Sequence, residues 1–354
     1  MKILCKLLIL IMLIPILSFS NNDESPFVKQ KVINKAYFVK PDAIINIDNS
    51  YGNITITTWD EDKIELDILI KVSGDNEKWV NKRIDDIDVK IEAFTNLVTA
   101  KTIIGESGFY NNGNSNSMEI NYVIKIPKSG GMKLNNKYGN IFSSDILGNV
   151  DIICKYGKIV LGKLNGNSCK IELGYCPKST IEFIKIGNID ARYSVLTISE
   201  AIYLNLDSNY TDIIVGDCQN LVYDSNYGKL KFNKVNKING SGNYMSLNIG
   251  EISNNLKIET HYSKITIGSI SEKANNIDID AGYSDLSIGF DVNYPFDFDL
   301  STKYGNIKLD SEFEFYNKEI TNSTKQYNGF YKKKEVNKLS ISSMYGNISI
   351  SKKQ

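Results

Sequence analysis

The sequence predicts an all-β protein built mainly as a β-solenoid, a parallel β-helix-like stack of about ten coils of 17–21 residues. Three observations predict this fold. A tyrosine recurs at that interval, aliphatic residues alternate on both sides of it, and a glycine or another small residue often follows it. A fixed period of this length is the signature of a repeat protein.

The repeated tyrosine defines each coil. Twelve of the 21 tyrosines keep one sequence context. They are Tyr51, Tyr138, Tyr156, Tyr175, Tyr193, Tyr210, Tyr227, Tyr244, Tyr262, Tyr283, Tyr304 and Tyr345. Around Tyr210, for example, Leu206 stands four residues before, and Ile213 and Val215 stand three and five residues after. Alternation with a period of two residues predicts a β-strand on each side of the tyrosine.

The two strands of a coil must meet at a bend. Counted from the tyrosine, the apolar residues lie at even distances before it and at odd distances after it. A regular strand cannot bury both sets on one face, so the chain must bend by one residue between them. We place this bend on the residue after the tyrosine, because it is often glycine, as at Gly139, Gly157 and Gly228. Glycine adopts backbone angles that are closed to other residues. A second corner is expected at glycines such as Gly216 and Gly250.

A coil of two short strands cannot bury its apolar face alone. Coils must therefore stack, about 4.8 Å apart, to form a continuous core. Each tyrosine is an even number of residues from the buried positions before it, so a regular strand places it on the same face. This favours an inward or corner stack of rings that stabilises the rod. In the alternative, the bend turns the rings outward and presents a row of aromatic faces suited to carbohydrate rings.

Residues 1–20 read as a secretory signal peptide. Lys2 and Lys6 precede an apolar run from Leu7 to Leu17, and Ser18-Phe19-Ser20 fits a cleavage site. The run is short for a membrane span, so no transmembrane anchor is expected after cleavage. The protein is then exported, to the periplasm, the outer membrane surface or the extracellular space.

Residues 21–130 are predicted to form a β-rich N-terminal region with one helix that caps one end of the rod. Ile64 to Val72 alternate as a strand, and a helix with Trp79, Val80 and Ile84 near one face follows Asp75. A cap is needed because an open solenoid end exposes unpaired strand edges.

Residues 131–354 are predicted to form the β-solenoid repeat region, with an insertion at about 312–338. The insertion reads as a covering hairpin or, alternatively, as an interaction loop. The final copy of the repeat, Leu339 to Ile350, is expected to close the other end of the rod.

Three motifs carry a family resemblance. They are the segment from Asp48 to Ile56 followed by Trp59, the segment from Tyr122 to Pro127, and the ladder of Tyr-Gly-Asn-Ile type repeats. With them the chain resembles the bacterial putative-adhesin family, a domain of unknown function related in style to the head-domain autotransporter adhesins. The resemblance implies an exported β-solenoid protein of the cell envelope.

The composition argues against most catalytic sites and against nucleic acid as a partner. His261 is the only histidine, which leaves little for a catalytic triad or a His-rich metal site. Lys and Arg number 41, as do Asp and Glu, so no net charge attracts nucleic acid. The cysteines after the signal peptide, Cys154, Cys169, Cys176 and Cys218, are expected to be buried free thiols, although an exported protein could form a disulfide.

A row of carboxylates is the one candidate metal site. Three residues before the tyrosine, acidic side chains recur on the outward face. They are Asp48, Glu172, Asp190, Asp207, Asp224, Glu259 and Asp280. We predict that Asp190, Asp207 and Asp224 form an oxygen-ligand site for a cation such as Ca²⁺, or else a polar strip for sugar hydroxyls. The alternative is an ordinary solvated face. No other cofactor is expected.

The sequence thus favours an exported cell-envelope protein with a non-catalytic, adhesin-like binding role on a repetitive surface. The expected partner is a glycan, the cell wall or another protein, and self-association is possible. Two alternatives remain: a structural or envelope-stress-associated periplasmic component, and a polysaccharide-active β-helix enzyme. The enzyme would need a local cluster of acids and lysines, whereas a binding role spreads along the ladder.

Overall fold

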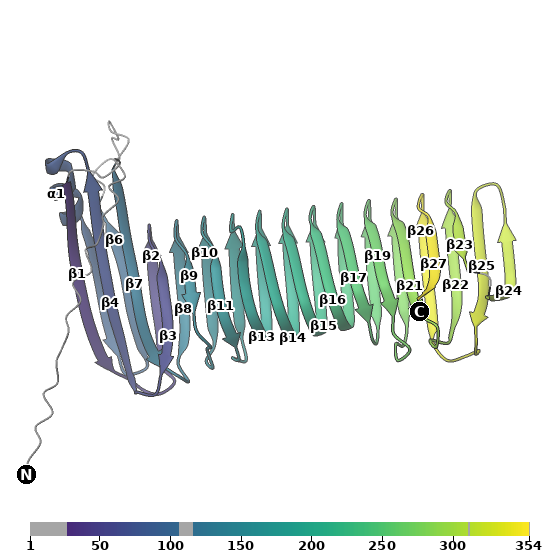
Figure 1. Ribbon diagram of the computed structural model, residues 1–354, viewed down its shortest axis with the longest axis horizontal. Helices are drawn as coiled ribbons and strands as arrows, with labels where there is room; N and C mark the ends of the chain where they lie inside the picture. The colour runs from purple at the N-terminus through teal and green to yellow at the C-terminus, as the bar shows by residue number, and fades with distance from the viewer. Residues whose placement is uncertain (1–26, 106–115, 311, 354) are drawn as a thin grey trace, which may run out of the picture.

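The computed structural model describes residues 27–105, 116–310 and 312–353, and most of them lie in β-strands. The strands stack side by side along a rod, with the N-terminal strands at one end and a hairpin at the other (Figure 1). The all-β solenoid prediction is confirmed. The predicted signal peptide, residues 1–20, lies outside the described residues. Within the described ranges, no helix has the length and apolar character of a membrane span.

In the central rod a strand lies on either side of each repeat tyrosine, and between Tyr175 and Tyr244 one continuous strand runs from each tyrosine to the next. The first coil is β2 (Ile44–Ser50) and β3 (Ile54–Trp59). The coils that follow contain β8 (Gly131–Lys137), β9 (Ile141–Ser143), β10 (Val150–Lys155), β11 (Ile159–Leu164), β12 (Cys169–Gly174), β13 (Ser179–Arg192), β14 (Val195–Asn209), β15 (Asp212–Asn226), β16 (Lys229–Asn243), β17 (Ser246–Ile252), β18 (Leu256–His261), β19 (Lys264–Ile270), β20 (Ile277–Gly282) and β21 (Asp285–Asp291).

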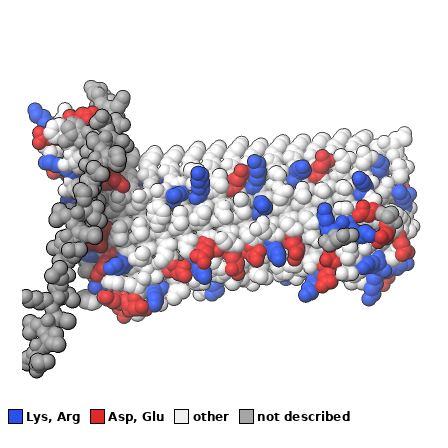
Figure 2. Space-filling model, in the orientation of Figure 1, with Lys and Arg blue, Asp and Glu red and all other residues white. Residues whose placement is uncertain are grey.

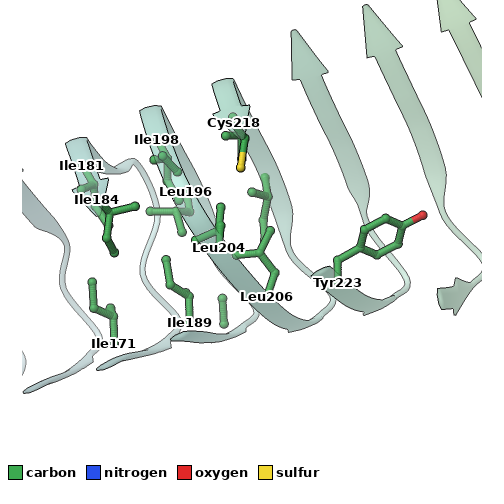
Figure 3. Close-up of a cluster of buried hydrophobic side chains, with 14 of the residues drawn as sticks. Ile171, Ile181, Ile184, Ile189, Leu196, Ile198, Leu204, Leu206, Cys218 and Tyr223 are labelled. Carbon is green, nitrogen blue, oxygen red and sulfur yellow. The ribbon is translucent and has the colours of Figure 1, made fainter. Parts of the chain in front are cut away.

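Neighbouring coils pair in parallel and in register. In β14 and β15, Leu196 pairs with Ile213 and Leu206 pairs with Tyr223, so each repeat position lies directly above its counterpart. The inward side chains form one aliphatic core along the rod (Figure 3). The residue four positions before each repeat tyrosine is apolar in every copy except one, where it is Gly240. Gly240 pairs with Tyr223. A Cβ on Gly240 would lie 2.0 Å from Cε1 of Tyr223, so this ring fills the space that the glycine leaves.

The predicted N-terminal cap is present. It consists of β1 (Phe27–Phe38), β4 (Lys63–Gly74), α1 (Glu77–Asp85), β5 (Ile87–Phe94), β6 (Leu97–Ile104) and β7 (Ser117–Pro127). β1, β4 and β7 form an antiparallel layer that joins β3, while β5 and β6 join β2. The predicted helix is confirmed as α1, with Asn76 as its N-cap and Val80 and Ile84 buried.

The final repeat copy does not close the rod, so this prediction is wrong. The C-terminal strands are β22 (Phe296–Lys303), β23 (Ile307–Leu309), β24 (Glu314–Ile320), β25 (Thr324–Tyr331), β26 (Lys338–Met344) and β27 (Ile348–Lys353). β26 lies between β20 and β22, and β27 lies between β21 and β23. The last copy therefore sits inside the stack, between two coils that precede it in the sequence.

The hairpin β24–β25 closes this end instead. β25 pairs antiparallel with β22, which satisfies the strand edge that the parallel repeat leaves open, and β24 pairs antiparallel with β25. The interpretation of the insertion as a covering hairpin is therefore confirmed. The chain then turns back from the hairpin, and this return places β26 against β20.

The position of the last copy makes a testable prediction. Ile341 is 2% exposed within the stack. Ile341→Ala should lower the free energy of unfolding by about 3 kcal/mol, because it removes buried methyl groups and leaves a cavity. Ser340→Ala, on the outward side of the same strand, should change it by less than about 0.5 kcal/mol. Thermal unfolding followed by circular dichroism measures both. Equal effects would contradict the burial of Ile341 in the core of the stack.

Candidate functional site

The bend of each coil lies on the tyrosine itself, one residue before the predicted place. All twelve repeat tyrosines have a left-handed backbone, with φ between 51° and 63°. This conformation is unusual for a residue with a side chain and turns the ring out of the coil. The residue after the tyrosine then points inward: Thr211, for example, is 1% exposed. The left-handed tyrosine thus absorbs the change of parity that the sequence requires.

Glycine after the tyrosine serves close approach between coils. A Cβ on Gly139 would lie 1.8 Å from the carbonyl oxygen of Gly52 in the adjacent coil. Where a hydroxyl residue replaces glycine, it bonds across coils instead. The backbone N–H of Cys176 donates to Oγ of Ser194, and the N–H of Ser194 donates to Oγ1 of Thr211. Small and hydroxyl residues at this position therefore hold successive corners together.

The twelve rings form one continuous stack, which we call the tyrosine ladder. Ring centroids of successive members lie 4.7–5.1 Å apart, and the ring planes differ by 2–19°. Eleven of the rings are 46–54% exposed. The corner stack is confirmed. A ladder of free aromatic faces is wrong, because each internal ring is covered on both faces by its neighbours. The ladder presents ring edges instead.

An open groove of about 890 Å³ runs beside the tyrosine ladder and is lined by residues of six coils. The edges of Tyr227, Tyr244, Tyr262, Tyr283 and Tyr345 line it, together with the residues one and two positions after each of the first four. The opposite row of outward side chains is Asp212, Lys229, Ser246, Lys264 and Asp285. We call this feature the tyrosine-ladder groove. It is long and repetitive, so it suits an extended ligand.

The predicted row of carboxylates is also formed. Asp190 pairs with Asp207, and Asp207 pairs with Asp224, so the three acids occupy equivalent sites in successive coils. Nε of Arg192 lies 2.7 Å from Oδ1 of Asp190, and Nη2 lies 3.0 Å from Oδ1 of Asp207. Burial lowers the pKa of the Arg192 guanidinium, but these two carboxylates raise it by more. Figure 2 shows acidic side chains in a row along the rod, with basic side chains among them.

Arg192 thus relieves the repulsion between the first two carboxylates. From the sequence alone, either a nearby basic side chain or a bound metal ion could have had this role. Among the described residues, no group of three His, Cys, Asp or Glu side chains is arranged to hold a metal ion. The Ca²⁺ site at Asp190, Asp207 and Asp224 stays a prediction. His261, the sole histidine, is exposed beside Gly282 near the C-terminal hairpin.

The strongly perturbed titratable groups lie inside the rod. Burial raises the pKa of Tyr122 and of Cys218 to about 12. The four described cysteines are buried with free thiols, as expected. Neither Tyr122 nor Cys218 lines the tyrosine-ladder groove. Perturbed groups mark catalytic sites when they face a cleft, so these shifts record core burial.

Sequence reasoning did not find the tyrosine-ladder groove, although its signal was present. The residue two positions after each tyrosine is polar in every copy that lines the groove, as at Lys229 and Lys264. The change of parity at the tyrosine is evident from the apolar residues, but it applies equally to these polar ones. Recognising the left-handed corner would have placed the tyrosine edge and this polar row on either side of one channel.

The tyrosine ladder should contribute to stability. Replacing Tyr210 and Tyr227 together with Ala removes three ring contacts, each worth about 1 kcal/mol. The melting temperature should fall. Tyr203→Ala is a matched control, because Tyr203 is 53% exposed and lies outside the ladder. Differential scanning calorimetry compares the variants. An unchanged melting temperature in the double variant would contradict a stabilising role of the tyrosine ladder.

The Ca²⁺ prediction is tested by calorimetry. Binding at about millimolar affinity is expected of such an open carboxylate site. It should be lost in Asp207→Asn and strengthened in Arg192→Gln, which frees two carboxylates from the guanidinium. Absence of binding heat in both the native protein and Arg192→Gln would exclude the metal site.

Comparisons with known proteins give structural neighbours but no family. No family model matches the chain, and the search of curated proteins found no match. It is similar to a putative cell adhesion protein from Clostridium sporogenes, with 12% identity over 91% of this chain and 100% of that one, at a TM-score of 0.18. It is also similar to a putative adhesin from Parabacteroides merdae, with 12% identity over 73% of this chain and 96% of that one, at a TM-score of 0.38. A putative adhesin from Bacteroides fragilis shares 15% identity over 91% of this chain and 97% of its own, at a TM-score of 0.27. At these TM-scores the likenesses carry no argument about function.

Proposed function

We propose that this protein is an exported cell-envelope protein with a non-catalytic, adhesin-like binding role. The observation that carries the proposal is the tyrosine-ladder groove, which repeats one set of contacts over four coils. An enzyme concentrates unlike groups at one place, whereas a repeated surface binds a ligand that is itself extended. The candidate ligand is therefore a glycan, a cell-wall polymer or an extended part of another protein.

The chemistry of the groove supports binding by side chains. The floor of the groove belongs to strands that pair with a neighbour on both sides, so their backbone groups are already used. An added peptide strand could not pair there. Tyrosine edges, lysines and hydroxyls remain, and these groups bind hydroxyl-rich ligands. A glycan fits this set better than a peptide.

A glycan and cell-wall array tests the proposal. The purified mature protein, with and without Ca²⁺, should bind one or more polymers. Ser246→Trp places a large ring in the centre of the groove and should weaken binding about tenfold or more, equal to about 1.4 kcal/mol. Asn248→Trp is the control, because Asn248 lies on the same strand and is exposed, but does not line the groove.

The remaining outcomes discriminate the alternatives. Ca²⁺-dependent binding that is lost in Asp207→Asn and Asp224→Asn would move the binding surface to the carboxylate row. A blank array with a well-folded sample would contradict the binding role and favour a structural envelope component.

A further inference from the structure

The polar wall of the tyrosine-ladder groove has an ordered pattern of charge. Across five paired coils its outward side chains are Asp212, Lys229, Ser246, Lys264 and Asp285. The wall thus reads acid, base, hydroxyl, base, acid. Its two lysines flank a neutral coil and are themselves flanked by carboxylates.

The two carboxylates at the ends are engaged with the backbone. The backbone N–H of Lys229 donates to Oδ1 of Asp212 at 3.0 Å, and the backbone N–H of Asn347 donates to Oδ1 of Asp285 at 3.0 Å. Lys229 and Lys264 are exposed, and neither forms an ion pair with a carboxylate of the described residues. The lysine ammonium groups are therefore the charges that the groove offers to a ligand.

The spacing of these charges selects the ligand. Lys229 and Lys264 are separated by two coil steps, about 10 Å along the rod. In an extended β-linked polysaccharide, one sugar advances by nearly the same distance as one coil. A polymer with a carboxylate on every second sugar would place its charges opposite both lysines and its uncharged sugar opposite Ser246.

The other wall favours sugars over nucleic acid. Single-stranded nucleic acids bind proteins by stacking bases on exposed aromatic faces. Here the rings of Tyr244 and Tyr262 lie 4.9 Å apart with planes 3° from parallel, so their faces are covered. The ring edges line the groove instead, and the phenol hydroxyl of each tyrosine is the group able to form hydrogen bonds with sugar hydroxyls.

We infer that the tyrosine-ladder groove binds an acidic linear polysaccharide whose carboxylate recurs on every second sugar, through Lys229 and Lys264. The inference rests on the proposed binding function and names the class of ligand. Tyrosine edges contact the polymer from one side, and the two lysines fix its register from the other.

The test compares four polymers on the native protein by calorimetry: hyaluronan, with alternate carboxylates; polygalacturonate, with one on every sugar; neutral chitin oligosaccharides; and single-stranded DNA. Hyaluronan should bind most tightly, and less tightly at high salt because screening weakens exposed charge pairs. Lys229→Gln with Lys264→Gln should weaken this binding about tenfold, as two exposed ion pairs are lost. Lys231→Gln with Lys234→Gln, exposed but outside the groove, is the matched control.

Each other outcome overturns the inference in a distinct way. Equal binding of DNA and hyaluronan would mean a general affinity for polyanions. Tight binding of the neutral oligosaccharides that survives both lysine substitutions would keep the binding function and reject the acidic ligand. Binding to none of the four polymers, with binding to other components of the cell-wall array intact, also rejects the acidic ligand alone. A blank on every polymer rejects the binding function as well.

Discussion

In-register pairing between successive coils is the constraint on which the rest of this structure depends. Because each residue lies above its counterpart, every repeat position becomes a straight row along the rod. A row must therefore be made of side chains that tolerate contact with their own kind. Aliphatic, hydroxyl and tyrosine rows meet this condition directly. The carboxylate row does not, and Arg192 bridges Asp190 and Asp207 where it would otherwise repel.

The tyrosine corner balances two opposing energies. A left-handed backbone on a residue with a side chain costs about 1–2 kcal/mol. Each internal ring stacks on two neighbours, and an aromatic pair contributes about 0.5–1.5 kcal/mol. The two terms are similar in size, so the stack is large enough to offset the strain of the bend. Glycine would form the same corner with less strain, but it would leave no ring to join one coil to the next.

Much of the fold could be predicted from the sequence because its repeat is short and its apolar positions are strict. The alternation around Tyr210 correctly indicated a strand on each side of the tyrosine. The position of the bend was missed because glycine after the tyrosine suggested a left-handed residue, whereas Gly139 is needed for close approach to Gly52. The order of the last coils could not be predicted, since the copy at Tyr345 has the same pattern as the others.

The candidate sites divide in the same way. The alignment of Asp190, Asp207 and Asp224 followed from the repeat alone, because it needs only the register. The bridging position of Arg192 depends on side-chain geometry that a period does not specify. The tyrosine-ladder groove depends on the backbone conformation at the corner. One wall comes from the tyrosine and the other from the residue two positions later. A regular strand would place these two side chains on the same face, whereas the left-handed tyrosine separates them.

The insertion of β26 and β27 between earlier coils limits how this protein could change in length over evolution. A simple repeat protein grows by adding units at either end. Here a unit added after β27 would start from strands that are already paired on both sides by β20, β21, β22 and β23. New coils could be accommodated only upstream, among the regular copies between β8 and β21. Gene duplication within that stretch would lengthen the tyrosine ladder and its groove without disturbing either end.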